Sequence, residues 1–322
     1  MSREQAVKEV LERAARVPDR FRRFEVGAET AARVHRIDGA LLDEALDLGL
    51  AYEGSGADRR FDDFDLKNLG LGLRIPSPAW LQVRLSAQPF NAEAVVTTTY
   101  RTRFQGRVGG AVLEPSSQLA SGVVDGTLRR MGPDVFEADL HISADENAPG
   151  AADCAADCAR ELGPVLPEAA RLEYYLVPDE LRDDVGFVRE TRLADCRAGT
   201  TYLAHVAAEA GAAVRSASGL LLAGAFPLPH AWLEVRRGDR WLPADPYYLI
   251  SMAGYGLLDG ERWPPHRSVA GTVWKICGPY ADLCFLATAS GGLSDGPSGG
   301  RPVGPSGGRP VKTSVRILRR ST

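Results

Sequence analysis

The spacing of apolar residues near the amino terminus predicts helices. From Val7 to Ala15, apolar side chains recur three and four residues apart, as they do along one face of a helix. Ser2, with Gln5 three residues later, is the signature of a capping box, so we expect the first helix to begin here. A second helical stretch is expected over residues 29–48. Most of residues 1–75 is therefore predicted to be helical.

The middle of the chain has the pattern of strands instead. Between Trp80 and Ile142, short runs rich in Val, Thr, Leu and aromatic residues, such as 95–104 and 135–142, are separated by Gly, Pro and Asn. This pattern is typical of a small antiparallel sheet.

Beyond residue 166 the pattern becomes sharper. We expect a helix over 196–210 that ends at Gly211, because glycine accepts the left-handed conformation that closes helices. Three strands follow, with a tight turn at Gly238 between the last two, and a further hairpin is expected around Gly278-Pro279. The expected strands are 214–225, 230–236, 240–248, 272–277 and 282–288.

Two segments show neither a helical nor a strand pattern of apolar residues. Residues 143–163 are mostly Ala, Asp, Gly and Pro, which indicates a boundary between domains. The octapeptide GPSGGRPV occurs twice in succession over 296–311, and it buries too little apolar surface to offset its ordering entropy. It is therefore predicted to be a flexible tail, with a short strand expected at 314–318. The predicted division is an amino-terminal helical and β-rich domain, a linker, a second domain and the tail, at 1–145, 146–165, 166–290 and 291–322.

Composition narrows the classes of function. Of 322 residues, 44% are hydrophobic and 25% are charged, which is typical of a globular protein of about two domains. The formal net charge of -4 provides no positive field, so we expect neither nucleic acid nor a membrane surface as a partner. The chain shows no secretory signal and no stretch able to span a bilayer, and it is predicted to be cytoplasmic.

The cysteine count supports the same location. The five cysteines are an odd number, and without an export signal we expect free thiols rather than a disulfide framework. Cys154 and Cys158, four residues apart, and Cys277 and Cys284, on either side of a predicted turn, are likewise expected to stay reduced.

Cys196 is the cysteine whose position carries a chemical expectation. It opens the predicted helix, where unpaired N–H groups and the positive end of the helix dipole favour a thiolate over a thiol. A thiolate there would be a nucleophile. Asp195, directly before it, opposes this effect if its carboxylate lies close by. Taken alone, Cys196 would more often be a small buried hydrophobic residue.

His230 and Asp245 lie on two successive predicted strands. A two-residue turn at Arg237-Gly238 would place them directly opposite each other, and a turn at Gly238-Asp239 would make them diagonal neighbours on one face. Either turn brings an imidazole and a carboxylate together. A carboxylate bound to one ring nitrogen fixes the tautomer and leaves the other nitrogen to take the proton of a thiol.

The segments ADCRAGTTYL and HAWLEVRRGDRWLPADP resemble the catalytic core of the transglutaminase-like superfamily, a papain-like cysteine fold. In that family a cysteine opens a helix, a histidine begins an H-A-W-x-E-V strand, and an aspartate follows on the next strand before a proline. The match carries over to Cys196, His230 and Asp245 and covers about residues 166–250. The residues RLAD before Cys196 depart from the glycine-rich approach common in the family.

The resemblance implies an α+β fold in which a helix bearing the cysteine packs on an antiparallel sheet, preceded by a helical and β-rich amino-terminal domain. It implies acyl transfer through a thioester at Cys196, from a peptide or small-molecule donor to water or an amine. Trp232 and Tyr247 are candidate substrate-binding residues, with ordinary packing as the alternative. No metal or organic cofactor is required. The sequence indicates neither the substrate nor the oligomeric state.

Other hypotheses remain open. The chain could be a binding or scaffold protein that keeps the fold without turnover, although a complete Cys-His-Asp set speaks against this. Acetyl transfer from coenzyme A to an arylamine is a third possibility. A zinc site using Cys196, His205 and His230 has suitable ligand types, but no CxxC or HxxxH pair supports it.

Overall fold

The computed structural model describes most of the chain and divides it into two units. The first unit consists of Met1–Arg84 and Arg171–Tyr202, and the second of Leu85–Ala170 and Leu203–Thr322. The units are interleaved along the chain and so differ from the continuous domains predicted from the sequence, which stay a prediction. The described residues are 2–91, 96–108, 111–112, 124–144, 155–222, 227–278, 282–290 and 316–317.

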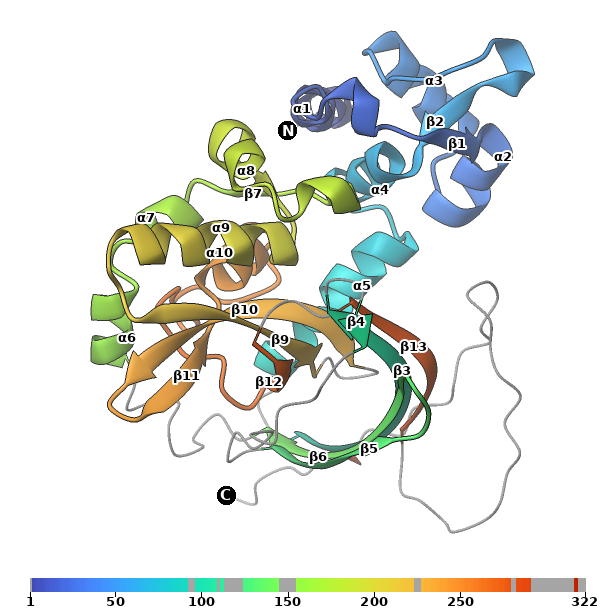
Figure 1. Ribbon diagram of the computed structural model, residues 1–322. Coiled ribbons are helices and arrows are strands. Elements are labelled where there is room, and N and C mark those ends of the chain that lie inside the picture. Colours follow the sequence, from blue (N-terminus) through green and yellow to red (C-terminus); the bar gives the residue numbers. More distant parts are fainter. Residues whose placement is uncertain are drawn as a thin grey trace. The chain divides into compact units, whose positions relative to one another are not determined.

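Helices dominate the first unit (Figure 1). Its strands form two small pairs, β1 with β2 and β7 with β8. The last residues of α5 and of α9 belong to the second unit. The elements are α1 (Arg3–Ala14), η1 (Asp19–Phe21), β1 (Phe24–Gly27), α2 (Ala28–Thr30), η2 (Ala31–His35), α3 (Gly39–Asp47), η3 (Gly56–Asp58), β2 (Arg60–Asp62), α4 (Asp63–Gly72), α5 (Pro78–Ser86), β7 (Glu173–Tyr174), η5 (Asp179–Leu181), α8 (Val185–Thr191), β8 (Leu193–Ala194) and α9 (Cys196–Glu209).

The first helix, α1, begins where the sequence predicts. The backbone N–H of Gln5 donates to Oγ of Ser2 at 3.2 Å, and Ser2 is extended, as an N-cap requires. The predicted apolar face, with Val7 and Val10, is buried in the core of the unit. A Cβ at Gly72, the last residue of α4, would lie 2.2 Å from Cγ2 of Val10. The close packing of α1 on α4 therefore depends on a glycine at this position.

The helix predicted over residues 29–48 is interrupted in the structure. The segment 31–35 forms a π-helical turn, and Arg36 follows with φ of 61°, in the left-handed region. A new helix, α3, then starts with the carboxylate of Asp38 accepting the N–H of Leu41 at 2.9 Å. The prediction of a single helix is wrong because the apolar spacing continues across a point where the backbone reverses and a new cap forms.

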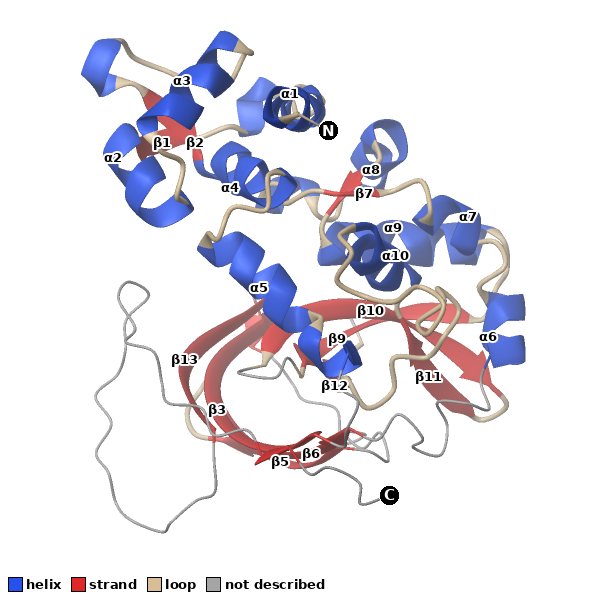
Figure 2. Ribbon diagram, turned by 180° about the vertical axis from the view of Figure 1, so that it is seen from behind, coloured by secondary structure: helices blue, strands red, loops and turns tan. Residues whose placement is uncertain are grey.

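The described residues of the second unit form two antiparallel sheets, whose strands are red in Figure 2. One has the order β11-β10-β9-β12, and the other has the order β13-β3-β6-β5, with β4 and β14 also paired to β3. The mixture of helices with antiparallel sheets agrees with the predicted α+β class. The elements are η4 (Gln88–Asn91), β3 (Val96–Val108), β4 (Ala111–Val112), β5 (Val124–Arg130), β6 (Val135–Ala144), α6 (Ala155–Glu161), α7 (Leu166–Ala169), β9 (Val214–Leu221), β10 (Leu228–Arg237), β11 (Arg240–Ala244), α10 (Pro246–Gly254), β12 (Val273–Cys277), β13 (Asp282–Ser290) and β14 (Arg316–Ile317).

Two strand predictions need correction. Trp80, taken as the start of the strand-rich block, lies in α5. The predicted hairpin around Gly278-Pro279 does not form, because β12 pairs with β9 and β13 pairs with β3 of the other sheet. Which partner a strand takes depends on contacts between distant segments, so proximity in sequence was misleading here.

One position in the β9–β12 ladder demands a glycine. A Cβ at Gly219 would lie 2.0 Å from the carbonyl oxygen of Trp274, and the register shifts just beyond, between Lys275 and Cys277. On the other side of β9, Gly219 is the ladder partner of His230 on β10. The strand that carries His230 is thus paired on both sides, with β9 and with β11.

The cysteines do not all have the predicted redox state. Cys158, fully buried on α6, is disulfide-bonded, whereas Cys196 is a free thiol. The prediction of five free thiols is therefore wrong, because pairing depends on which cysteines the fold brings within bonding distance rather than on their count. Cys154 lies outside the described residues, as does the repeated octapeptide of 296–311.

None of the helices in the described ranges combines the length and the hydropathy that crossing a bilayer requires. The predicted cytoplasmic location stays a prediction.

Candidate functional site

The structure brings His230 and Asp245 together. Arg237 pairs with Arg240, so the turn between β10 and β11 is Gly238-Asp239, with φ of 55° at the glycine. This is the turn for which a diagonal arrangement of His230 and Asp245 was predicted. Nε2 of the imidazole lies 2.6 Å from Oδ2 of the carboxylate, and the two residues are only 5% and 4% exposed. Because a carboxylate can only accept, Nε2 is the nitrogen that carries the proton in this bond.

Asp245 is fixed by a helix as well as by the imidazole. It lies one residue beyond β11 and is the N-cap of α10, where its Oδ1 accepts the backbone N–H of Tyr248 at 3.1 Å. Pro246 follows at the first position of the helix, which suits proline because no N–H is needed there. Each carboxylate oxygen thus has its own donor. The prediction of a strand continuing to Tyr248 is wrong, because this cap starts a helix.

Aromatic rings surround the imidazole of His230. The ring of Trp232 is stacked on it at a centroid distance of 6.2 Å, and the ring of Tyr248 meets it edge-on at 5.4 Å. The hydroxyl of Tyr248 lies 2.9 Å from Oγ of Ser86, at the end of α5. Burial raises the pKa of Tyr248 well above its usual range. Its phenol therefore stays protonated and serves as a wall of the site rather than as a base.

The two predicted substrate-binding residues are both inside the protein. Trp232 and Tyr247 are 1% and 3% exposed. Within the described part of the chain, the indole Nε1 of Trp232 is buried and has no hydrogen-bond partner. Packing, the alternative considered from the sequence, accounts for both side chains here. A direct role in substrate binding stays a prediction.

Glu234, on the same strand as His230, is buried and ion-paired. Its Oε2 accepts from Nε of Arg215 on β9 at 2.6 Å and from Nζ of Lys275 on β12 at 2.5 Å. The guanidinium of Arg215 also lies 4.0 Å from the ring centroid of Trp241 on β11. These contacts join all four strands of the sheet that carries the imidazole.

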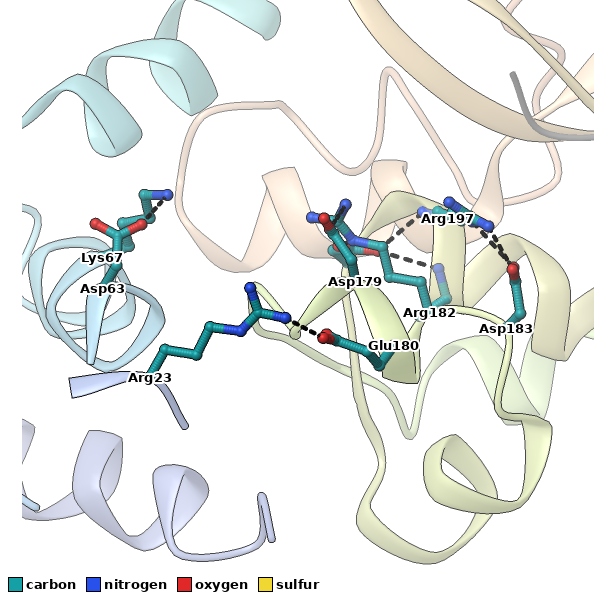
Figure 3. Close-up of polar contacts among 10 residues, drawn as sticks. Arg23, Asp63, Lys67, Asp179, Glu180, Arg182, Asp183 and Arg197 are labelled. Atoms are coloured by element: carbon teal, nitrogen blue, oxygen red, sulfur yellow. Dashed lines mark hydrogen bonds and ion pairs between the residues drawn. The ribbon is translucent and has the colours of Figure 1, made fainter. Parts of the chain in front are cut away.

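Cys196 is the first residue of α9 and is partly exposed. The residue before it, Asp195, caps the helix: its Oδ1 accepts the N–H groups of Arg197 at 3.1 Å and of Ala198 at 3.0 Å. Its Oδ2 accepts from Nε of Arg182 at 2.6 Å. Figure 3 shows Arg182 beside Asp179, and Arg197 beside Asp183, around this turn.

The structure therefore places the three predicted catalytic residues in two groups. Cys196 belongs to the first unit, while His230 and Asp245 belong to the second. The hydrogen bond between the latter two is observed, and the approach of the thiol to the imidazole is part of the proposal below. Sequence reasoning missed Arg182 and Ser86. The separation of Arg182 from Asp195, and of Ser86 from Tyr248, matches neither a helical nor a strand period, so no sequence pattern indicated these contacts.

A zinc site has no support in the described residues. No three His, Cys, Asp or Glu side chains among them lie together as metal ligands would. His205, one of the three candidate ligands, is exposed on α9, and its Nε2 lies 3.2 Å from Oε1 of Glu209.

Comparisons with known proteins give likenesses to solved structures, of which two are described here. No family model and no curated protein matches the sequence. A candidate cysteine protease from Cytophaga hutchinsonii is 11% identical over 64% of this chain and 93% of that chain, with a TM-score of 0.31. A transglutaminase structure is 13% identical over 45% of this chain and 50% of that chain, with a TM-score of 0.21. The chain thus spans half the length of the transglutaminase. Both TM-scores are low, and the proposal that follows rests on the site itself.

Proposed function

We propose that this protein is a cysteine acyl-transfer enzyme in which Cys196 is the nucleophile, His230 the base and Asp245 the residue that orients the base. The observation that supports it best is the 2.6 Å contact between His230 on β10 and Asp245 at the start of α10, made by two buried side chains. The fold holds this pair from several sides, through the cap of α10 and the stacked ring of Trp232. Such a fixed imidazole is what general-base catalysis requires.

In the proposed reaction the acyl group passes through the sulfur. The Cys196 thiol gives its proton to Nδ1 of His230, and the sulfur attacks the carbonyl carbon of an amide or thioester. The bond from that carbon to the leaving nitrogen or sulfur then breaks, and the imidazolium returns its proton to the leaving group. Water or an amine attacks the resulting thioester, His230 accepts its proton, and the thiol is restored. The negative charge of Asp245 stabilises the imidazolium in both halves.

The tetrahedral intermediate needs a donor for its negative oxygen. The cap formed by Asp195 binds the amides of Arg197 and Ala198, the second and third residues of α9. The amide of Cys196 itself is the first of the helix, and in this proposal it donates to the oxyanion. The positive end of the dipole of α9 also stabilises the negative oxygen in this proposal.

The acyl donor in this proposal is a peptide or a small molecule, and the acceptor is water or an amine. The acceptor decides between hydrolysis and amide formation. Acetyl-coenzyme A, with an arylamine as acceptor, is one donor of this kind. The protein would work without a metal or organic cofactor, since the nucleophile and the base suffice for the chemistry.

Intact-mass spectrometry tests the proposal. The protein is incubated with a panel of peptide, amide and thioester donors, acetyl-coenzyme A included, and quenched in acid. We expect a mass increase equal to the acyl group of at least one donor, lost in Cys196→Ala and strongly reduced in His230→Asn. His205→Asn is a matched control, because that imidazole is exposed and contacts Glu209 on the neighbouring turn of α9, and it should acylate normally.

Two outcomes would overturn the proposal. One is an acyl adduct that persists in Cys196→Ala. The other is the absence of any adduct together with slow alkylation of Cys196 by limiting iodoacetamide at pH 6, no faster than that of an unfolded control. The second result would favour the scaffold hypothesis.

A further inference from the structure

The carboxylate of Asp195 presents an electrostatic problem for a nucleophile at Cys196. A negative charge beside the first residue of a helix strengthens the cap but disfavours a second negative charge on the neighbouring sulfur. Asp195 is 4% exposed, so bulk water screens its charge little. Left alone, this residue would oppose the thiolate that the proposed function requires.

The structure supplies a counter-charge to this carboxylate. Nε of Arg182 donates to Oδ2 of Asp195 at 2.6 Å, while Oδ1 keeps the two capping hydrogen bonds. Arg182 comes from the segment after η5, thirteen residues earlier in the chain. One oxygen therefore serves the helix and the other is neutralised by the arginine.

Two further carboxylates, of Asp179 and Asp183, lie on the outer side of the arginines and do not cancel the effect of Arg182 on Asp195. Arg182 also pairs with Asp179, and Arg197 pairs with Asp183. The side chains of Asp179 and Asp183 are 75% and 62% exposed, against 22% and 18% for the two arginines. Water screens the two outer carboxylates more than the arginines. The less exposed charges around the turn, two arginines and one aspartate, thus leave a net positive charge.

Another arginine of the first unit contacts α9 beyond its first turn. Arg192, just before β8, donates to the hydroxyl of Tyr202, farther along α9. The contacts around the first turn of α9 include the charged side chains of Asp179, Arg182, Asp183, Asp195 and Arg197.

We infer that Arg182 is a positioning residue for the nucleophile: by neutralising Asp195 it lets the capped start of α9 stabilise a thiolate at Cys196. The inference rests on the proposed function in taking Cys196 as the nucleophile. It assigns to Arg182 a task that is carried out through the carboxylate of Asp195.

The test is the pH profile of alkylation of Cys196 by limiting iodoacetamide, followed by intact mass in the full-length protein. Arg182→Gln removes the positive charge and leaves a hydrogen-bonding side chain. We expect the midpoint of the profile to rise by about one pH unit, which makes alkylation below the midpoint about tenfold slower. Arg182→Lys should restore most of the wild-type profile. Arg23→Gln is the matched control, since it breaks the exposed pair with Glu180 of η5 (Figure 3) and should leave the midpoint unchanged.

A second variant tests the charge of Asp195 itself. Asparagine caps helices as well as aspartate does, but carries no charge. In Asp195→Asn the midpoint should therefore fall below that of the wild type, and in the double variant Asp195→Asn/Arg182→Gln it should return towards the wild-type value, because the effects of two charges on one thiol add. A midpoint that either single substitution leaves unchanged overturns the inference. Thermal unfolding of each variant shows whether the substitution has caused a general loss of structure. If such a loss were the cause of the shifted midpoint, Arg182→Lys would not restore the wild-type pH profile.

Failure of the proposed function is distinguishable from failure of this inference. Alkylation needs only a reactive thiol, so the midpoint can be measured whether or not an acyl donor is found. Opposite shifts in Arg182→Gln and Asp195→Asn, without any acyl-enzyme, would support the electrostatic role of Arg182 and count against acyl transfer.

Discussion

Replacing Asp245 by asparagine separates its two tasks. In the structure one oxygen caps α10 through the N–H of Tyr248, and the other binds Nε2 of His230 at 2.6 Å. Asparagine is an equally good cap, so Asp245→Asn keeps the helix and removes the charge beside the imidazole. Asp245→Ala removes both, and loss of the cap adds about 1 kcal/mol to its destabilisation.

The magnitudes follow from the burial of this pair. A hydrogen bond to a charged group contributes about 1.5–3 kcal/mol to stability, and we expect Asp245→Asn to lose roughly that amount. In a Ser-His-Asp triad the same replacement lowers kcat by about 10⁴-fold because the imidazole takes the wrong tautomer. We therefore expect acylation of Cys196 to fall by about 10²- to 10⁴-fold in Asp245→Asn.

Two assays measure these effects on the same protein samples. Urea unfolding gives the change in unfolding free energy, and quenched-flow intact mass gives the rate of acylation with a donor that modifies the wild type. Asp38→Asn is the control, because that carboxylate caps α3 at the surface and takes no part in the proposed site. It should change stability by a few tenths of a kcal/mol and leave the rate alone. An Asp245→Asn protein that acylates within about threefold of wild type would refute the role given to the charge.

Three further predictions concern stability. Gly219→Ala should cost about 2 kcal/mol or more in urea unfolding, because its Cβ would meet a backbone oxygen of β12 at 2.0 Å; Gly254→Ala, whose Cβ has nothing within 4 Å, should cost nothing. Equal losses of stability in the two variants would show that the predicted clash at Gly219 does not determine the cost. The hydrogen bond with His35 lowers the pKa of Asp63 to about 2, so the group stabilises the fold above its ordinary value of 3.8 and loses this effect as the pH falls towards 2. Since the side chain is 44% exposed, we expect about 1 kcal/mol rather than the ~2.4 of the full shift, seen as a wild-type advantage over Asp63→Asn at pH 6 that is lost near pH 2.5. Glu234→Gln removes the buried counter-charge of two cations and should cost about 1.5–3 kcal/mol in the same assay, whereas a cost below about 0.5 kcal/mol would show that the cluster contributes little.

Local signals in the sequence located several helix ends and one tight turn well. The cap at Ser2, the start of α9 at Cys196 and the glycine that ends this helix depend on interactions within a few residues. The same holds for the turn at Gly238-Asp239. Because that turn has two residues, strand geometry alone places His230 diagonal to Asp245. The errors inside these segments are also local: the helix beginning after Asp245 was taken for more strand.

Contacts between distant segments were predicted less well from the sequence. The pairing of β12 with β9 and of β13 with β3, the disulfide at Cys158 and the contact of Ser86 with Tyr248 were all missed or mispredicted. Each joins segments that are not related by a helical or strand period. The burial of Glu234 between two cations belongs to the same class, since its partners come from the two strands β9 and β12.

The amino-acid sequence by itself thus determined where helices begin and that His230 and Asp245 come together, because caps, tight turns and the alternation along a strand operate within about fifteen residues. Only the tertiary structure decided the surroundings in which they act: which strands flank His230, what covers its ring, and that Arg182 lies on the carboxylate beside Cys196. Those features depend on packing and charge pairing between segments that no helical or strand period relates, so the sequence pattern does not predict them.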